Sequence, residues 1–231
     1  MIPKIIHYCW FGGHPLPAST RKYIESWRKF LPGYEIKEWN ESNFDVDALA
    51  YTRDAYAARK YAFVSDYVRF KVLYEQGGLY FDTDVEVVRP LDDIIARGPF
   101  MGWETANALG QYSIAPGLCI GCEPGMAWLK AVLDEYQTLA FRLPDGRINP
   151  YSMIPMVTKL LGSNGLRMDG SEQAVSGLTL YPADFFCPMN SLTGEVRLTD
   201  NTRTIHWYSM SWLPWWRRLR LRVMRRVRRY L

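Results

Sequence analysis

The chain has 231 residues, of which 48% are hydrophobic, 23% charged and 15% aromatic, and its formal net charge is +4. This length accommodates one large domain or two small ones, and the composition excludes a disordered or low-complexity protein. The sequence has no run of about 18 apolar residues of the kind that spans a membrane. We expect no signal peptide, because residues 1–7 read as a strand.

The first half of the chain has the pattern of an α/β domain. Short apolar–aromatic runs predict strands, and the longest helical region, which could contain two helices, stops at Gly77-Gly78. A helix that gives way to a strand through glycines is typical of α/β domains. The elements predicted here are strands at 5–11, 34–39 and 79–88, a helix at 19–30 and the helical region at 51–75.

The second half is less regular. Glycine and proline interrupt residues 100–122, so only short strands are expected there. Further along, the pattern predicts helices at 126–141 and 154–161, a strand and turn at 178–188, and a last strand at 204–206. Because no internal repeat or linker is visible, we predict one domain over 1–212, followed by an appendage over 213–231.

Two carboxylates, Asp82 and Asp84, lie within the strand predicted at 79–88. Alternate side chains of a strand share a face, so the two acids would project together and repel each other unless a cation lies between them. A hard divalent ion such as Mn²⁺ or Mg²⁺ suits carboxylate ligands and keeps positions open for phosphate oxygens. A solvated turn with two acids is the common alternative. The preceding Gly77-Gly78 pair and apolar run favour a metal–diphosphate site.

A second polar group precedes these acids. Asp66 and Arg69 are three residues apart in a predicted helix and therefore share one of its faces. An ordinary surface ion pair, worth about 0–1 kcal/mol, would give the same pattern. Because so few residues separate the pair from Asp82, we favour a polar clamp for the hydroxyls of a ligand.

Two further positions could complete a nucleotide site. Trp10 ends the first predicted strand beside a glycine pair and could stack on a base, a contact worth about 1–3 kcal/mol in nucleic-acid systems. A tryptophan of the core is the alternative. His206 ends the last predicted strand, where an imidazole could complete a Mn²⁺ shell alongside carboxylates. Ser211 and Trp212 follow and could donate hydrogen bonds to phosphate.

The four cysteines are predicted to be buried, reduced thiols. Cys119 and Cys122 have the CxxC spacing of zinc ligands or of a redox pair, but the sequence offers no second ligand pair and no thioredoxin-like context. Buried thiols suit a reducing compartment, so we expect a cytoplasmic protein.

Three stretches together resemble the glycosyltransferases of the family 32 type, which carry an Asp-x-Asp motif and include capsular-polysaccharide sugar transferases. These stretches are IPKIIHYCWFG at 2–12, SDYVRFKVLY at 65–74 and GGLYFDTD at 77–84. The similarity covers residues 1–90 and returns at 204–212, where His206, Ser211 and Trp212 close the pattern.

The resemblance implies a GT-A fold, which is a Rossmann-like α/β domain with a mixed sheet and the Asp-x-Asp loop at its edge. It also implies a metal-dependent, retaining glycosyltransferase that takes a sugar from a nucleotide-sugar, with UDP favoured over GDP and Mn²⁺ over Mg²⁺. The acceptor would be a glycan or a lipid-linked glycan in the synthesis of a surface polysaccharide such as a capsule.

The resemblance also implies roles for individual residues. Trp10 would stack on the base, Asp66 and Arg69 would hold hydroxyls of the donor sugar, and Asp84 would bind the metal. The implied assignments are Asp66, Arg69, Asp82 and Asp84 as catalytic, Trp10, His7, Asp66, Arg69, Tyr80, Asp82, Ser211 and Trp212 as donor-binding, and Asp82, Asp84 and His206 as metal ligands.

Retention of configuration requires either a double displacement or a front-face attack. A double displacement needs an enzyme nucleophile near the anomeric carbon. Asn149, Glu104 and Asp184 are candidates by residue type, and none of them is singled out by the sequence. The front-face route, in which the leaving phosphate helps to deprotonate the acceptor, is the usual proposal for the family.

Residues 213–231 contain eight arginines and no acid, whereas the rest of the chain holds 20 basic and 24 acidic side chains. At about 100° per residue, the apolar side chains of this tail cluster on one side and most arginines on the other. This pattern predicts a basic amphipathic helix of the kind that lies on anionic lipid. We expect peripheral attachment to the inner face of the cell membrane; docking on an acidic protein or on nucleic acid are alternatives.

Two other functions fit part of the sequence. A metal-dependent phosphohydrolase that cleaves nucleotide-sugars would use the same diphosphate site. A nucleic-acid-binding protein would use the arginines of the tail, but it would leave Asp82 and Asp84 unexplained, and the chain shows no recognisable nucleic-acid-binding module. We therefore expect no nucleic-acid partner.

Overall fold

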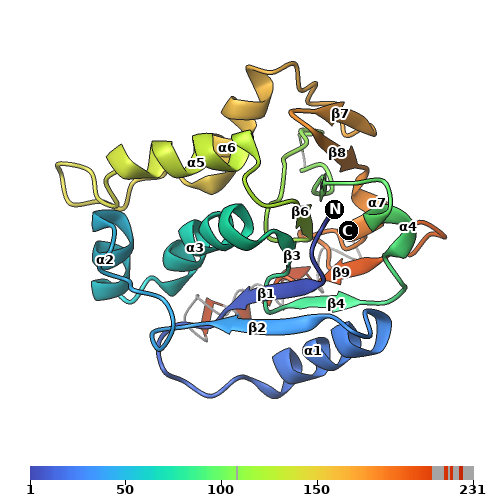
Figure 1. Cartoon of the computed structure of the whole chain (residues 1–231), viewed down its shortest axis with the longest axis horizontal. Coiled ribbons are helices and arrows are strands. Elements are labelled where there is room, and N and C mark those ends of the chain that lie inside the picture. Colours follow the sequence, from blue (N-terminus) through green and yellow to red (C-terminus); the bar gives the residue numbers. More distant parts are fainter. Residues whose placement is uncertain (108, 210–215, 218, 221–223, 226–231) are drawn as a thin grey trace.

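The computed structural model describes residues 1–107, 109–209, 216–217, 219–220 and 224–225 (Figure 1). Strands and helices alternate from the N-terminus onward, which confirms the predicted α/β class. The elements are β1 (Ile5–Cys9), α1 (Ala18–Phe30), β2 (Glu35–Trp39), α2 (Ala50–Ala57), α3 (Tyr61–Gln76), β3 (Gly78–Tyr80), β4 (Val85–Val87), α4 (Asp92–Ile95), β5 (Phe100–Gly102), β6 (Ile120–Cys122), α5 (Ala127–Thr138), α6 (Met153–Gly162), β7 (Gln173–Val175), β8 (Leu178–Tyr181), α7 (Ala183–Phe186) and β9 (Thr204–His206).

Seven strands form one mixed sheet in the order β2-β1-β3-β6-β5-β8-β7. β1 lies parallel to both β2 and β3, whereas β6 is antiparallel to β3 and to β5. β4 and β9 form a separate antiparallel ladder in which Val85 lies opposite His206 (Figure 1). The last strand of the chain therefore returns to the strand that follows the two acids.

Hydrophobic cores cover both faces of the large sheet. Successive residues of a strand point to opposite faces, so Leu79 of β3 packs in one core with Trp27 of α1. Its neighbour Tyr80 belongs to the other core, which is formed with α2, α3, α5 and α6 (Figure 1). This alternation places α3, and with it Arg69, on the same face of the sheet as the Tyr80 ring.

The two acids lie in a turn, so the prediction of one strand over 79–88 is wrong. β3 ends at Tyr80 and β4 begins at Val85, and the turn between them is closed by a hydrogen bond from Val85 N to Asp82 O (3.1 Å). The backbone N–H of Asp82 donates to Gly117 O (3.0 Å), next to β6, instead of continuing a ladder. The two carboxylates consequently face different partners.

The glycine pair predicted to end the long helix does so. Gly77 and Gly78 have φ values of +64° and +98°, a region that side-chain-bearing residues rarely adopt. A Cβ atom on Gly78 would lie 2.6 Å from the carbonyl oxygen of Ile5. Glycine thus lets α3 pass directly into β3, which brings Arg69 of the helix close to the acids that follow the strand.

Most other predicted elements occur with shifts of a few residues. The helical region at 51–75 is indeed two helices, α2 and α3, and the predicted final strand at 204–206 is β9. The four cysteines are buried and free, as predicted. The sequence pattern did not indicate α4 or β7.

None of the helices in the described part of the chain is long and apolar enough to cross a membrane. Most of the tail, and with it the predicted amphipathic helix, lies outside the described residues, as do Ser211 and Trp212. Two apolar side chains of the tail that the structure does describe, Trp216 and Leu219, are 50% and 53% exposed.

Candidate active site

Arg69 is a buried cation between two carboxylates. Its Nη2 atom lies 3.0 Å from Asp66 Oδ1 and 3.1 Å from Asp82 Oδ1, and only 3% of its side chain is exposed. The guanidinium also lies over the Tyr80 ring, 4.7 Å from its centroid. Burial raises the pKa of Asp66 to about 6 and also raises the pKa of Asp82, although Arg69 opposes both changes. The predicted pairing of Asp66 with Arg69 is confirmed, and Asp82 joins it.

Gly117 borders the carboxylate of Asp82. A Cβ atom at this position would lie 2.0 Å from Asp82 Oδ2 and 3.0 Å from Arg69 Nη1. This Nη1 atom is buried and has no hydrogen-bond partner among the described residues. The absence of a side chain at Gly117 therefore leaves a carboxylate oxygen and a guanidinium donor next to each other. A hydroxyl group, which both donates and accepts, matches this pair.

Asp84 forms a second, separate ion pair with His206. Asp84 Oδ1 lies 3.0 Å from His206 Nε2, and the two side chains are 12% and 13% exposed. Asp84 Oδ2 accepts hydrogen bonds from the backbone N–H (2.7 Å) and the hydroxyl (2.9 Å) of Ser209. Burial opposes ionisation, but His206 and Ser209 outweigh it and hold the pKa of Asp84 below its usual value. Burial likewise opposes the charge on His206, whose pKa is nevertheless raised by Asp84.

The segment after β9 bends around Asp84. Trp207 N donates to the backbone oxygen of Asp84 (2.9 Å), and Tyr208 adopts a φ of +46°. A left-handed conformation is uncommon for an aromatic residue and costs about 1–3 kcal/mol, so it persists only where the surroundings fix it. The result of this bend is that Ser209 points back to Asp84. The sequence drew attention to the hydroxyls after His206 but did not identify this contact.

Asp84 and His206 have donor atoms that suit a divalent transition-metal ion. Carboxylate oxygen and imidazole nitrogen are both ligands for Mn²⁺, and here they already approach each other. Asp82, the third predicted ligand, is instead turned towards Arg69. In the part of the chain that the structure describes, no three His, Cys, Asp or Glu side chains are grouped closely enough to hold a metal. Asp84 and His206 would supply two of the ligands of such an ion.

His7 and Tyr80, two of the predicted donor-binding residues, are buried beside the site. His7 is fully buried, and its ring nitrogens contact Trp39 Nε1 (3.1 Å) and Gly77 O (2.9 Å). Tyr80 is 1% exposed and lies beneath Arg69. Neither side chain has surface left for direct contact with a donor, so their effect on the site is to position its neighbours. Trp10 is half-buried, and its Nε1 donates to His14 O (2.5 Å).

Of the three nucleophile candidates, Glu104 is connected to the Asp84–His206 pair through Tyr208. Its carboxylate accepts hydrogen bonds from Ser113 Oγ (2.7 Å) and Tyr208 Oη (3.3 Å), and the Tyr208 ring packs on His206 with centroids 4.2 Å apart. The side chains of Asn149 and Asp184 hydrogen-bond elsewhere, to Ala140 and to Thr199 and Asn201 respectively.

Comparison with known proteins finds similarity to glycosyltransferases in the region that contains Asp82 and Asp84. Residues 17–101 match the family described as the glycosyltransferase sugar-binding region containing the DXD motif. Over 122 residues the chain is 32% identical to the uncharacterized glycosyltransferase L373 of Acanthamoeba polyphaga mimivirus. This alignment covers 48% of the chain and 47% of the mimivirus protein, so the chain matches about half of that relative's length.

Two solved structures share the fold. The PaToxG glycosyltransferase superposes with a TM-score of 0.54 at 20% identity, covering 70% of this chain and 69% of its own. A glycosyltransferase involved in the glycosylation of the major capsid of PBCV-1 superposes with a TM-score of 0.50 at 13% identity, covering 95% and 100%. Residues 17–101 are therefore similar to the glycosyltransferase sugar-binding region that contains the DXD motif, and the chain has the GT-A fold.

Proposed function

We propose that this protein transfers a sugar from a nucleotide-sugar, in the first place a UDP-sugar, to a hydroxyl group of a glycan or lipid-linked glycan, with retention of anomeric configuration. The observation that carries the proposal is that Asp82 and Asp84, in one turn, belong to two separate polar groups. Arg69 lies between Asp66 and Asp82, while Asp84 lies against His206. The first site suits sugar hydroxyls, and the second suits the diphosphate end of the same donor.

In this proposal the sugar is held by the group around Arg69. Arg69 Nη1, which is buried and has no hydrogen-bond partner in the part of the chain that the structure describes, and the neighbouring Asp82 oxygen offer a donor and an acceptor. A ligand hydroxyl that replaces the missing partner removes the cost of an unsatisfied buried donor, about 1–3 kcal/mol. Trp10 stays assigned to the base, and Ser211 and Trp212 to the diphosphate.

Asp84 and His206 would hold a divalent cation, with Mn²⁺ favoured and Mg²⁺ as the alternative. Such an ion, when bound, neutralises the charge that develops on a departing diphosphate. The chain's own contribution is orientation, because the two hydrogen bonds from Ser209 fix the Asp84 carboxylate. The GT-A fold with a DXD motif generally uses a divalent metal, which supports this assignment.

The test is binding of UDP, GDP, CMP and ADP, each with and without Mn²⁺, to the wild-type protein and to Asp84→Asn. We expect Mn²⁺-dependent binding of UDP that is lost in the variant, since the amide removes the charge that pairs with His206 and the ion. Asp93→Asn is the matched control, because Asp93 also pairs with a cation, Arg203 (2.7 Å), but is exposed and lies in α4. Binding of none of the four nucleotides would overturn the proposal.

Incubation with UDP-sugars then separates transfer from hydrolysis. A transferase moves the sugar to an added glycan, whereas a phosphohydrolase consumes the donor at the same rate whether or not a glycan is present. Synthesis of a surface polysaccharide is the biological role that we propose for the transfer. The test of that role is loss of the polymer when Asp84 is replaced in the living cell.

A further inference from the structure

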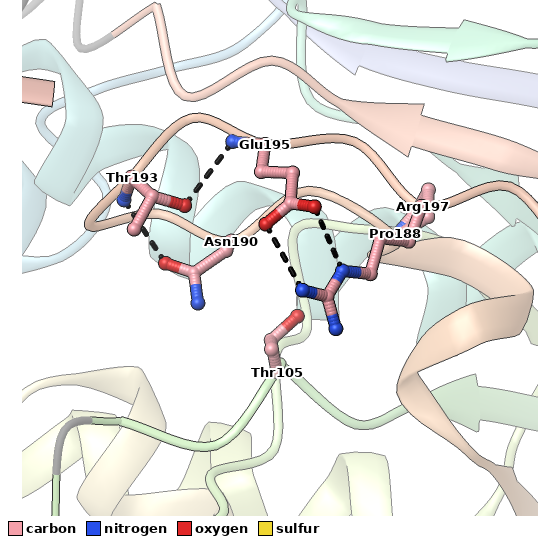
Figure 2. A pocket seen from close by; sticks show the side chains of 6 residues that line it. All are labelled: Thr105, Pro188, Asn190, Thr193, Glu195 and Arg197. Carbon is pink, nitrogen blue, oxygen red and sulfur yellow. Dashed lines mark hydrogen bonds and ion pairs between the residues drawn. The ribbon is translucent and has the colours of Figure 1, made fainter. Parts of the chain in front are cut away.

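The molecule contains a cavity that the donor site does not use. It has a volume of about 270 Å³ and is lined by Thr105, Pro188, Asn190, Thr193, Glu195 and Arg197 (Figure 2). Ligand pockets for whole cofactors and drug-sized molecules measure roughly 300–1,000 Å³. The cavity is therefore of the size for one small ring and too small for a nucleotide.

The wall of this cavity is a loop held by its own hydrogen bonds. Residues 188–197 fold back on themselves through a bridge between Met189 and Val196 and through hydrogen bonds from Asn190 N to Glu195 O and from Arg197 N to Pro188 O. The side chain of Asn190 accepts hydrogen bonds from the backbone N–H groups of Leu192 (2.9 Å) and Thr193 (3.1 Å). A preorganised wall of this kind lowers the entropy lost on binding.

The polar side chains that line the cavity suit a neutral ligand with many hydroxyl groups. Figure 2 shows the Asn190 amide nitrogen, the Arg197 guanidinium and the Thr105 side chain directed towards one space. Arg197 forms two hydrogen bonds with Glu195, at 3.0 and 3.2 Å, so each of the two charges has an opposite charge beside it. Glu195 would repel an anion and Arg197 would repel a cation. Hydroxyl groups, in contrast, can donate hydrogen bonds to a carboxylate and accept them from a guanidinium.

The cavity is connected to the candidate active site by direct contacts. The Thr105 hydroxyl donates to Cys187 O (2.8 Å), and Cys187 Sγ lies 3.0 Å from Tyr208 Oη. Tyr208 in turn donates to Glu104, the neighbour of Thr105, and packs on His206. Thr105, Cys187 and Tyr208 thus link the cavity to the Asp84–His206 pair.

We propose that this cavity is the acceptor subsite and binds one neutral sugar ring of the acceptor glycan. The inference rests on the proposed function, since an acceptor subsite has a role only next to a donor site. Pro188 offers an apolar surface to the C–H face of the ring, and Asn190, Arg197 and Thr105 contact its hydroxyl groups. Glu104 lies between this ring and the donor site, where it positions the Tyr208 hydroxyl.

The experiment measures binding of methyl glycosides of glucose, galactose, mannose and N-acetylglucosamine by saturation-transfer NMR. We expect at least one of these glycosides to bind the wild-type protein. The variants Asn190→Asp and Arg197→Gln should bind it at least about fivefold more weakly, because each loses one hydrogen bond to the ligand. Asp at 190 still accepts the two backbone hydrogen bonds of the loop but no longer donates to the ligand, so the wall keeps its shape.

Arg147→Gln is the matched control, because Arg147 pairs with an acid two residues earlier, Asp145, in another exposed loop, as Arg197 pairs with Glu195. UDP binding in the presence of Mn²⁺ is measured on every variant and should not change. If none of the four glycosides binds, or if Asn190→Asp and Arg197→Gln bind them as the wild type does, the inference is wrong. Binding of a glycoside without binding of UDP would instead overturn the proposed function, and the cavity would then be a sugar site with no donor site beside it.

Discussion

At the scale of single residues, the orientation of Asp82 depends on a position that has no side chain. Gly117 accepts the backbone hydrogen bond of Asp82 and leaves room for its carboxylate beside Arg69. The backbone conformation of Gly117 is one that other residues also adopt, so the lack of room for a side chain explains the glycine here. The sequence contains Pro116-Gly117, which reads as a turn, and nothing local relates this glycine to an acid 35 residues earlier in the chain.

The variant Gly117→Ala should lose about a hundredfold in sugar transfer, because a displacement of about 1 Å at a reacting group has that effect. The new Cβ atom would lie 2.0 Å from Asp82 Oδ2, so the carboxylate must move away from Arg69. Rates of transfer with a UDP-sugar and thermal unfolding should be measured together. Gly162→Ala is the control, since a Cβ atom there meets nothing within 4 Å. Wild-type rates in Gly117→Ala would show that Asp82 does not need its present position.

At the scale of elements, His7 joins three segments that carry the site. It extends from β1, receives a hydrogen bond from Trp39 at the end of β2, and donates to Gly77 at the end of α3. Because Trp39 donates to Nδ1, the proton of the neutral ring is on Nε2. Burial, the largest influence, lowers the pKa of His7 to about 4. The neutral form of this one residue therefore fixes where α3 ends relative to the first two strands.

This burial predicts how stability depends on pH. The unfolded chain has the ordinary histidine pKa of about 6.5, so between pH 6.5 and pH 4 it binds more protons than the folded protein does. The stabilisation that His7 provides is therefore complete above about pH 6.5 and is lost as the pH falls, by up to about 3 kcal/mol.

Urea unfolding of the wild type and of His7→Gln across this pH range measures the effect, since Gln keeps both hydrogen bonds but does not titrate. We expect the free energy of unfolding to fall more steeply with acid in the wild type. His14→Gln, at an exposed position, should behave as the wild type does. Parallel curves for wild type and His7→Gln would contradict the prediction.

Helices, strands and turns that depend on a short stretch of sequence could be predicted. Contacts between distant segments could not, because they depend on the order of the strands in the sheet. The apolar runs, the glycine pair and the spacing of Asp66 and Arg69 are local, and each has the expected counterpart. The turn at Asp82 and Asp84 was missed because its apolar neighbours continue the pattern of a strand on both sides. The contact of Gly117 with Asp82 requires β6 to lie beside β3, an arrangement that follows from the whole sheet.

At the scale of the whole molecule, the unequal distribution of charge predicts where the protein works. Eight arginines are confined to residues 213–231, while the rest of the chain has four more acidic than basic side chains. Each cation near an anionic lipid surface contributes about 1 kcal/mol, and the exposed Trp216 and Leu219 supply apolar area next to them. We propose peripheral attachment to the inner face of the cell membrane, where a lipid-linked acceptor would lie.

Flotation with vesicles tests this proposal. The full chain should float with vesicles that contain anionic phospholipid, and a chain that ends at residue 212 should not, while UDP binding by the two proteins stays equal. Vesicles of neutral phospholipid are the control, and high salt should weaken the binding because it screens the charges. Equal flotation of the two proteins would exclude the tail as the membrane anchor, and binding to DNA in the absence of lipid would favour a nucleic-acid partner.

The hydrogen bonds from Ser209 to Asp84 join residues 125 positions apart in the chain. Contacts over such distances form late, because closing a long loop costs entropy before the contact forms. During synthesis, the ribosome releases Asp82 and Asp84 well before His206 and Ser209 are made. A nascent or prematurely ended chain thus presents both acids without the partners that orient Asp84. Activity would therefore begin only after synthesis has passed residue 209, so unfinished chains would not consume nucleotide-sugar.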